Sequence, residues 1–547
     1  MRNVTYINAG AGSGKTYTLT KILAEKLSKK EVKPSEVILT TFTELAAAEF
    51  KEKARQQILS TDNMEVASQM DCAAIGTVHS VALGFIKKFW FLLEYGADIQ
   101  TISERDEDFY MSQSLARIAS MPEHKSDLDN FRKFRDFFDI LDSSNHPDHL
   151  FWQQHLNAVV EKMEYYGVDV VEVSTQKSIE TLRAVYTGKP VDYNFIASAL
   201  KEYGNFCATK FDDGRSGTKA HEHYDAVAKL LLEKRDQDWL TRVKTLMKTP
   251  CCEKAAEQAC TNFTNLKDQL SVADTSVDAL AILEPFVKSV FRLAKVWRDD
   301  FIAYKRNNHI ISYNDMEQIF LRLLTDYEEV QDYVRSHYRL VMVDEFQDSN
   351  PIQLKIFNKL SEIIAEADGH SYWVGDPKQA IYGFRGADTD LVNSVADHFT
   401  FYDDAEIHEE EGPRNLATGR LVESWRSRKK LVDLVNAVFY EPFKNDGINK
   451  LCIKLDAHFK NDDNVNSNAI VHWECGDSIK NQQDAADALA FKVKELLDSK
   501  MQVHSGKRDE PATAISPRDV AILCRKNSAC KEVVKALRKY GIPVSEA

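Results

Sequence analysis

Two blocks of polar residues in the middle of the chain carry the side chains best suited to chemistry. The first, DEFQD at 344–348, directly follows the apolar run 340–343. The second, GDPKQAIYGFRGAD at 375–388, follows the apolar run 372–374. Each block places acids, amides or aromatic rings where a buried strand would end. Because open parallel sheets bind ligands at the carboxyl ends of their strands, both blocks predict a cleft lined by these side chains.

A glycine-rich sequence near the N-terminus, AGAGSGKT at 9–16, follows another predicted strand, at 4–7. Its glycines let the backbone curl so that N–H groups face phosphate oxygens, and the helix predicted from Lys15 adds its partial positive charge. Lys15 would reach the β and γ phosphates of a nucleotide, and Thr16 would bind Mg²⁺. The strict Walker A pattern has glycine where this chain has Ala9, so a glycine-rich turn that binds nothing is the alternative. The predicted nucleotide-binding residues of this loop are Ala9, Gly10, Ala11, Gly12, Ser13, Gly14, Lys15 and Thr16.

The acids of the first polar block suit phosphate chemistry. Asp344, at the end of its apolar run, suits the carboxylate that holds Mg²⁺ in enzymes with such a loop. Glu345 comes next along the backbone and points elsewhere, so it can orient or deprotonate an attacking water. An isolated Asp-Glu pair would favour an exposed turn, but Gln347 and Asp348 continue the polar run directly after a buried strand. Asp344 and Glu345 are therefore predicted to be catalytic.

Composition and charge limit the class of protein. The 547 residues predict roughly two to four domains, and 44% hydrophobic with 28% charged residues is ordinary for a soluble globular protein. No apolar run approaches the ~20 residues of a membrane span, and no signal peptide precedes the first strand. Nine cysteines without a CxxC pair indicate reduced thiols, so we predict a cytoplasmic protein with no membrane partner. The net charge of −14 argues against a non-specific nucleic-acid coat but allows a local basic track.

The order of predicted elements indicates an α/β fold with a large helical insertion. Strand and helix alternate over residues 1–95, with strands predicted at 4–7, 36–41 and 74–77 and helices at 15 to about 28, 44–59 and 79–95. This alternation is typical of a parallel sheet covered on both faces. Residues 96–296 show sustained 3.6-residue apolar spacing and no strand pair, so this part is predicted to be helical. The α/β pattern resumes within 297–412, which contains both polar blocks. Residues 413–547 then form a second α/β segment.

Strands are predicted at 469–473 and 520–524 of that last segment, with a loop over 499–517. Helices are predicted after Trp425, at about 483–497 and at 530–540.

Two features are not assigned a function. His146 with His149, and His221 with His223, lack a third ligand at sensible spacing, so solvated loops are favoured over zinc. The stretches 85–95 and 131–140 mix basic and aromatic residues, but an amphipathic helix burying its aromatic side chains is favoured over a DNA-facing stripe.

The chain resembles superfamily 1 DNA helicases of the UvrD/Rep class, and most closely the RecB-like (AddA-like) motor subunits of exonuclease V complexes. Seven blocks carry the resemblance in family order: AGAGSGKT (9–16), TTFTELAAAEFKEKAR (40–55), IGTVHS (75–80), VDEFQDSNPIQ (343–353), VGDPKQAIYGFRGAD (374–388), ESWRSRKKLVDLVN (423–436) and DVAILCRKN (519–527). The amino-acid sequence of the fifth block favours a resemblance to RecB over one to UvrD. So does the absence of a glutamine-bearing segment ahead of the phosphate loop.

The resemblance implies a P-loop NTPase with a RecA-like parallel sheet domain formed by 1–95 and 297–412. Residues 96–296 would be its helical insertion arm, and 413–547 part of a second RecA-like domain. The implied activity is that of an ATP-dependent DNA helicase that uses ATP and Mg²⁺ in double-strand break repair and recombination. The implied partners are single-stranded DNA, junctions of single-stranded and duplex DNA, and other subunits of a helicase–nuclease complex.

The resemblance also assigns roles around the nucleotide. Gln379 would contact the γ-phosphate and couple hydrolysis to movement. Trp425 lies where the family places an aromatic side chain that stacks on adenine, and Arg426 lies where it places an arginine finger. Such a finger contributes on the order of 10³–10⁵ in rate. The alternative for Trp425 and Arg426 is an ordinary helix N-terminus with a packed tryptophan.

A further set of residues is implied to contact DNA. Aromatic side chains at strand ends would stack on bases, which contributes roughly 1–3 kcal/mol per base and ignores sequence. Core packing is the alternative for Phe42 and Tyr382, and a structural role is the alternative for His79. The set is Thr41, Phe42, Thr77, His79, Tyr382, Phe384 and Arg385.

The family's two later motifs, a second DNA-gripping segment and a second arginine finger, are not found in this sequence. We therefore expect the chain to be the N-terminal portion of a longer protein and to have little or no helicase activity alone. A UvrD/Rep-like repair helicase without a nuclease and a DNA-binding module without turnover remain as alternatives. A metabolic P-loop kinase is excluded by the two polar blocks.

Overall fold

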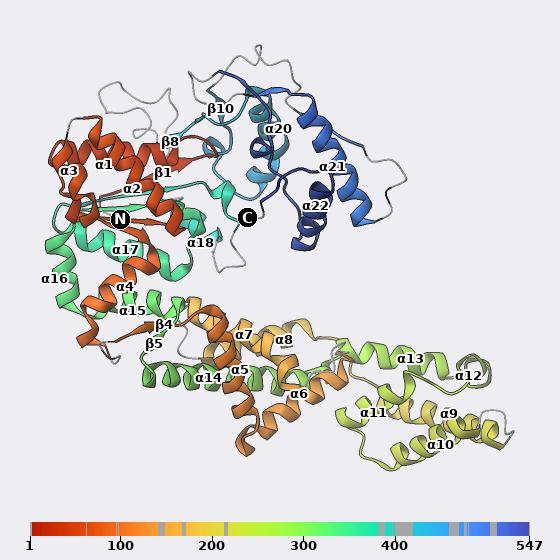
Figure 1. The fold of residues 1–547 in the computed structure, drawn as a ribbon. Helices are drawn as coiled ribbons and strands as arrows, with labels where there is room; N and C mark the ends of the chain where they lie inside the picture. The colour runs from red at the N-terminus through yellow and green to blue at the C-terminus, as the bar shows by residue number, and fades with distance from the viewer. Residues whose placement is uncertain are drawn as a thin grey trace. The chain divides into compact units, whose positions relative to one another are not determined.

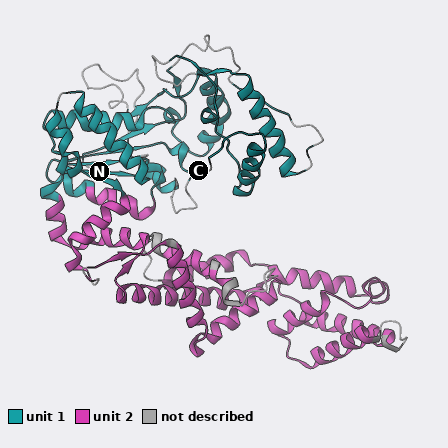
Figure 2. Ribbon diagram, in the orientation of Figure 1, with its two compact units in different colours: residues 1–77, 335–349, 361–547 teal, residues 78–334, 350–360 magenta. Residues whose placement is uncertain are grey.

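The computed structural model describes most of the chain and divides it into two compact units. The residues described are 3–61, 63–93, 96, 98–140, 148–166, 171–212, 217–381, 389–396, 398–399, 419–458, 470–474, 479, 481–503 and 511–545. Unit 1 comprises residues 1–77, 335–349 and 361–547, and unit 2 comprises 78–334 and 350–360 (Figure 2).

Unit 1 contains a six-stranded sheet whose described pairings are all parallel. The strands are β1 (Val4–Ala9), β2 (Val37–Thr41), β3 (Ala74–Thr77), β6 (Leu340–Val343), β7 (His370–Gly375) and β8 (Arg420–Leu421). Their order across the sheet is β3-β2-β6-β7-β1-β8. The predicted α/β class with a RecA-like parallel sheet is confirmed.

Each face of the sheet has its own apolar layer, because side chains alternate along a strand. On one face, Ile7 and Val374 join a buried cluster with side chains of helices α1 (Lys15–Ser28) and α2 (Glu44–Leu59). On the other face, Tyr6 lies against Phe346 and Phe399, and Trp373 stacks on Phe346 with ring centroids 4.9 Å apart. Strands buried on both faces explain why these runs read as continuously apolar in the sequence.

The predicted elements of the first α/β segment are confirmed with small changes at their ends. Helices α1 and α2 and strands β3 and β6 begin and end where the sequence predicts them. Helix α4 (Val78–Lys88) is shorter than the predicted helix over 79–95, because a 3₁₀ turn, Trp90–Leu92, follows it.

Unit 2 is helical throughout its described length except for short pairings. The 28-residue helix α14 (Leu280–Asn307) contacts α5 (Glu104–Ala119), α6 (Lys125–Phe137), α7 (Asp148–Tyr166) and α8 (Val171–Val185) (Figure 1). A second apolar cluster joins α9 (Tyr193–Asp212), α10 (Gly217–Leu232), α11 (Gln237–Met247) and α13 (Phe263–Val272). Only β4 (Gln100–Thr101) with β5 (Ile310–Ile311) and one isolated bridge form β pairings among the described residues of this unit. Within the described part of the whole chain, no helix is both long and apolar enough to span a membrane.

The last segment of unit 1 has the predicted helices but not the predicted strands. The helices are α20 (Lys429–Asn445), α21 (Gln482–Asp498) and α22 (Asn527–Lys539). Residues 470–473 and 520–524 are not strands, so those two predictions are wrong where the residues are described. Within the predicted loop over 499–517, Gln502–Val503 pairs instead with Thr513–Ala514. An apolar run forms a strand only when a neighbouring strand supplies its ladder hydrogen bonds, and none pairs with these runs in the part of the chain described here.

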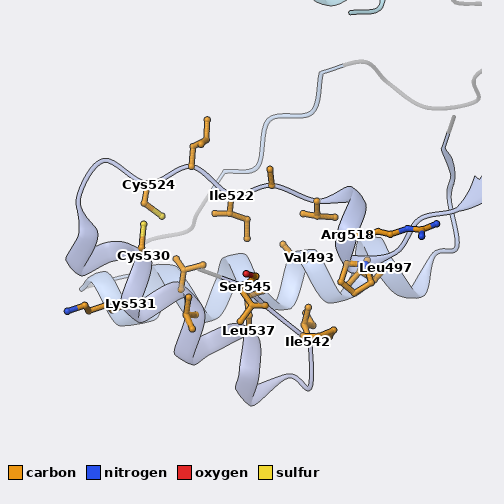
Figure 3. Close-up of a pocket in the computed structure, with 18 of the residues that line it drawn as sticks. Val493, Leu497, Arg518, Ile522, Cys524, Cys530, Lys531, Leu537, Ile542 and Ser545 are labelled. Atoms are coloured by element: carbon orange, nitrogen blue, oxygen red, sulfur yellow. The ribbon is translucent and has the colours of Figure 1, made fainter. Parts of the chain in front are cut away.

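The run 520–524 instead lines one side of an open groove of about 1140 Å³. Figure 3 shows Ile522, Val493 and Leu537 turned toward the same space, with α21 and α22 forming its floor. Leu523 is 97% exposed, as expected for an alternating run with one face on an apolar layer.

The domain boundaries predicted at 95/96, 296/297 and 412/413 remain predictions. The compact units divide at 77/78, 334/335, 349/350 and 360/361, and β8 at Arg420–Leu421 belongs to the sheet of β1.

A matched pair of leucines tests the packing that supports the sheet. Leu23 on α1 is fully buried, whereas Leu45 on α2 is 79% exposed. We predict that Leu23→Ala lowers the free energy of unfolding of unit 1 by about 2–5 kcal/mol through cavity formation, while Leu45→Ala changes it by less than about 0.5 kcal/mol. Chemical denaturation followed by circular dichroism measures both; equal effects would contradict the described packing of α1.

Candidate nucleotide and catalytic site

The phosphate loop connects β1 to α1 at the carboxyl edge of the sheet. Gly14 caps α1 in the left-handed conformation, and Gly12 has φ +73°. The Ser13 N–H donates to the carbonyl of Gly10 at 3.1 Å, which closes the loop on itself. The Ser13 hydroxyl is buried and has no hydrogen-bond partner among the described residues. An orphaned buried hydroxyl in front of a helix N-terminus suits an anionic oxygen ligand.

The segment after β8 approaches this loop so closely that one loop position must be glycine. The Trp425 N–H donates to the carbonyl of Gly12 at 2.8 Å. A Cβ on Gly12 would lie 2.6 Å from the Cβ of Arg426 and 3.1 Å from the Ser424 hydroxyl. Trp425 and Arg426, both exposed, therefore lie beside the phosphate loop, and their predicted contacts with the nucleotide remain predictions.

The acids after β6 lie opposite the loop lysine. Lys15 forms an ion pair with the carboxylate of Glu345. Glu345 has the left-handed conformation, with φ +54°, which is uncommon for a residue with a side chain. Such outliers persist where surrounding contacts hold them and concentrate at functional sites. The Glu345 N–H donates to Asp344 Oδ1 at 3.0 Å, so the two carboxylates share one turn.

Burial and like charge change the titration of two of these acids. Burial, followed by the charge of Glu345, raises the pKa of Asp344 to about 6. The same two causes in the same order raise the pKa of Asp348 to about 6. Lys15 opposes both shifts through its positive charge. A divalent cation would favour the ionised carboxylates in the same way, so the acid set fits Mg²⁺.

The Gln347 side chain forms hydrogen bonds with two of these acids. Its amide N–H₂ donates to Glu345 Oε2 at 2.8 Å and to Asp348 Oδ2 at 3.2 Å. Its carbonyl oxygen accepts from the backbone N–H of Asp376 at 2.9 Å, which links the end of β6 to the end of β7. Because Gln347 is buried, its amide holds both carboxylates in fixed directions.

The second polar block contributes a layer centred on Asp376. The Gln379 side chain donates to Asp376 Oδ2 at 2.7 Å, and Lys378 Nζ lies 2.8 Å from Asp376 Oδ1. The structure thus places Gln379 beside Asp376, at the end of the strand next to β1. Its predicted γ-phosphate contact remains a prediction.

Some of the predicted DNA-contacting residues belong to unit 1 and one belongs to unit 2. Thr41 and Thr77 are register partners at the ends of β2 and β3, and Phe42 directly follows Thr41. The Thr77 hydroxyl donates to Glu44 at 2.9 Å. In unit 2, His79 Nε2 lies 3.0 Å from the carboxylate of buried Glu317. The predicted DNA contacts Tyr382, Phe384 and Arg385 lie outside the described residues.

Three residues with roles in the site received none from the sequence. Gln347, Asp348 and Asp376 complete the hydrogen-bond network of the acids. The signal in the sequence was their position immediately after a buried strand, where a polar side chain usually serves a ligand or a hydrogen-bond network. The acid that each of them contacts depends on strand register, so it could not be predicted from the sequence.

The chain belongs to the UvrD/REP helicase family. The family model described as "UvrD/REP helicase N-terminal domain" matches residues 1–400, which includes the phosphate loop and both polar blocks.

The curated relatives are more specific. The chain is 24% identical to an ATP-dependent helicase/nuclease subunit from Staphylococcus haemolyticus over 98% of its own length and 46% of the relative's. For the proteins of the same name from Bacillus pumilus and Listeria monocytogenes the identities are 25% and 22%, over 98% and 99% of this chain and 47% of each relative. The chain thus spans about half the length of the curated relatives it matches. The predicted resemblance to AddA-like proteins of the UvrD/Rep class is confirmed.

The raised pKa of Asp344 predicts a pH-dependent cost to stability. An acid whose folded pKa lies above its unfolded value of about 3.8 destabilises the fold as pH rises from about 4 to about 6, and the cost then stays constant. We predict that Asp344→Asn, in a chelating buffer, raises the free energy of unfolding at pH 7 by on the order of 1–3 kcal/mol and leaves it unchanged at pH 4.

Asp71→Asn is the control for this prediction. The Asp71 carboxylate accepts a hydrogen bond from Lys51 and pairs with its charge, which lowers the pKa of Asp71. The substitution should therefore bring no gain in stability at pH 7. Urea denaturation at the two pH values measures both variants. An Asp344→Asn chain that is no more stable than wild type at pH 7 would show that the carboxylate is not destabilised by its surroundings.

Proposed function

We propose that this chain is the ATP-driven motor portion of a RecB/AddA-like helicase–nuclease, which couples ATP hydrolysis to movement on single-stranded DNA in double-strand break repair. The observation that carries the proposal is the meeting of Lys15, on the phosphate loop, with Glu345 and its neighbouring acids after β6. A cation-bearing loop at a helix N-terminus facing clustered carboxylates is the arrangement that phosphoryl transfer needs.

The phosphates of ATP would lie on the loop 9–16. Backbone N–H groups and the α1 N-terminus favour the anionic oxygens, and the orphaned Ser13 hydroxyl gains a partner. Lys15 would exchange the Glu345 carboxylate for the β and γ phosphates, which is a trade of one charge-assisted contact for another. That exchange leaves Glu345 able to act on a water molecule.

Thr16 and Asp344 would hold Mg²⁺, which when bound draws charge from the phosphate oxygens. Glu345, held by Gln347, would orient a water molecule toward the γ-phosphorus and take its proton as the bond to the β–γ bridging oxygen breaks. Arg426, exposed beside Gly12, would stabilise the charge that develops on the transferred group. Trp425 would stack on the adenine.

Gln379 would contact the γ-phosphate and couple its loss to movement of the motor. Its bond to Asp376, whose N–H binds Gln347, gives it a short connection to the hydrolytic acids. A change in the Gln379 contact would therefore reach Glu345 through two hydrogen-bonded residues.

DNA would run over the carboxyl ends of β2 and β3. Thr41, Phe42 and Thr77 lie there, on the opposite side of β6 from the phosphate loop. For Tyr382, Phe384, Arg385 and His79, contact with DNA is proposed from the family resemblance alone. Base stacking without base-edge hydrogen bonds would give binding that ignores sequence and weakens with salt.

The helicase/nuclease names of the relatives favour a complex with further subunits over a repair helicase without nuclease. A DNA-binding module without turnover is the other candidate, and the paired Lys15 and Glu345 argue against it because neither is needed for DNA binding.

Lys15→Ala tests the nucleotide site directly. We predict that it weakens Mg²⁺-ATP binding by roughly 10- to 150-fold, since a charge-assisted contact contributes about 1.5–3 kcal/mol. Lys21→Ala removes an exposed lysine from the same helix and should leave the affinity unchanged. Isothermal titration of the 547-residue chain measures both; equal affinities of wild type and Lys15→Ala would refute the assignment.

A further inference from the structure

One face of the Trp425 indole is already occupied by another ring. The His458 imidazole stacks on it with ring centroids 3.3 Å apart and planes inclined by 20°. Trp425 nevertheless remains 51% exposed. Since His458 covers one face, the opposite face of the indole is the one on which a further ring could stack.

His458 is held in this position by backbone and side chain together. Strand β10 (Asp456–Ala457) pairs in parallel with β9 (Glu423–Ser424), and the His458 N–H donates to the carbonyl of Ser424 at 3.0 Å. The imidazole Nδ1 lies 3.1 Å from Glu423 Oε2. The His458 backbone is therefore attached to the residues immediately before Trp425, and the contact with Glu423 holds the ring over the indole.

The same segment is tied to the phosphate loop. The Trp425 N–H binds the carbonyl of Gly12, and the Ser424 hydroxyl lies 3.4 Å from the carbonyl of Ala11. The distance from the loop to the indole is thus set by backbone contacts, and the direction of the indole plane is set by His458.

We propose that His458 is a positioning residue for the nucleobase of the bound nucleotide, forming the outer layer of a stack in which Trp425 is the middle layer and the purine base the inner one. The proposal rests on the proposed function, because it places the base of ATP on Trp425. His458 would touch the indole and not the base, and would act by restricting the rotation of the indole, so that its other face is turned toward a base whose phosphates lie on the loop. Binding then costs less ordering of the Trp425 side chain.

Charge at the imidazole is not required for this role, whereas ring shape is. His458→Ala removes the outer layer and frees the indole. His458→Phe keeps a flat ring over Trp425 and loses the contact with Glu423. Aromatic pairs contribute enough to predict a three- to tenfold rise in the dissociation constant for Mg²⁺-ATP in His458→Ala, and a change of less than about twofold in His458→Phe.

The test compares Mg²⁺-ATP with Mg²⁺-bound inorganic triphosphate, which has the phosphates and no base. Both are titrated calorimetrically into the 547-residue chain and into His458→Ala, His458→Phe and the control His221→Ala, which removes an exposed histidine from α10. Triphosphate affinity should be the same in all four proteins, and ATP affinity should fall in His458→Ala alone.

Each other outcome overturns the proposal in a recognisable way. Equal loss of ATP and triphosphate affinity in His458→Ala, while His458→Phe stays normal, would mean that the ring supports the phosphate loop and not the base. Tighter ATP binding by His458→Ala would mean that the imidazole covers the face the base uses. Unchanged ATP binding would mean that the stack has no part in binding. A wild-type chain that binds neither ligand would remove the proposed nucleotide site, and the inference with it.

Discussion

The site depends on one electrostatic constraint, the gathering of three carboxylates within a single turn after β6. Asp344, Glu345 and Asp348 repel one another, and burial makes the repulsion stronger because the surroundings screen it less. Lys15 supplies the opposing charge from a position 330 residues away in the sequence from Glu345. Gln347 supplies donors to two of the acids. Without these partners the acids would be expected to take up protons or turn toward solvent.

The parallel sheet makes that meeting possible. Strand β7 pairs with both β1 and β6: its Trp373 aligns with Val343, the last residue of β6, and its Gly375 aligns with Asn8, the residue before the end of β1. The phosphate loop and the acidic turn therefore leave the sheet at the same edge and at the same height. Strand β8 adds a third segment on the far side of β1, which delivers Ser424–Arg426 against Gly12. Three segments far apart in sequence thus converge where an open parallel sheet binds ligands.

The sequence was sufficient where an element depends on its own residues. The phosphate loop, α1, α2 and β6 follow from local apolar runs, glycines and helix-forming residues, and they lie where predicted. The runs 470–473 and 520–524 were wrong as strands because strand formation depends on a neighbour, which an apolar pattern cannot reveal.

Contacts between residues far apart in the sequence were the hardest to predict. The sequence identified Lys15 and Glu345 separately, but their ion pair follows from strand register. The stack of His458 on Trp425 depends on the pairing of β9 with β10, two strands of only two residues each, and no motif marks His458.

The most direct test of the account is ATP hydrolysis by the 547-residue chain and its Glu345→Gln variant, with and without single-stranded DNA. The account predicts that the variant binds Mg²⁺-ATP at least as tightly as wild type, since Lys15 no longer has a carboxylate to exchange for phosphate. It also predicts that hydrolysis, measured in a single turnover so that slow rates are resolved, falls by at least about 100-fold, as expected when a general base is lost. Duplex DNA of the same length should stimulate wild-type hydrolysis less than the single strand does. A Glu345→Gln chain that hydrolyses ATP at the wild-type rate would contradict the account, because the acids gathered around Lys15 would then have no part in the chemistry.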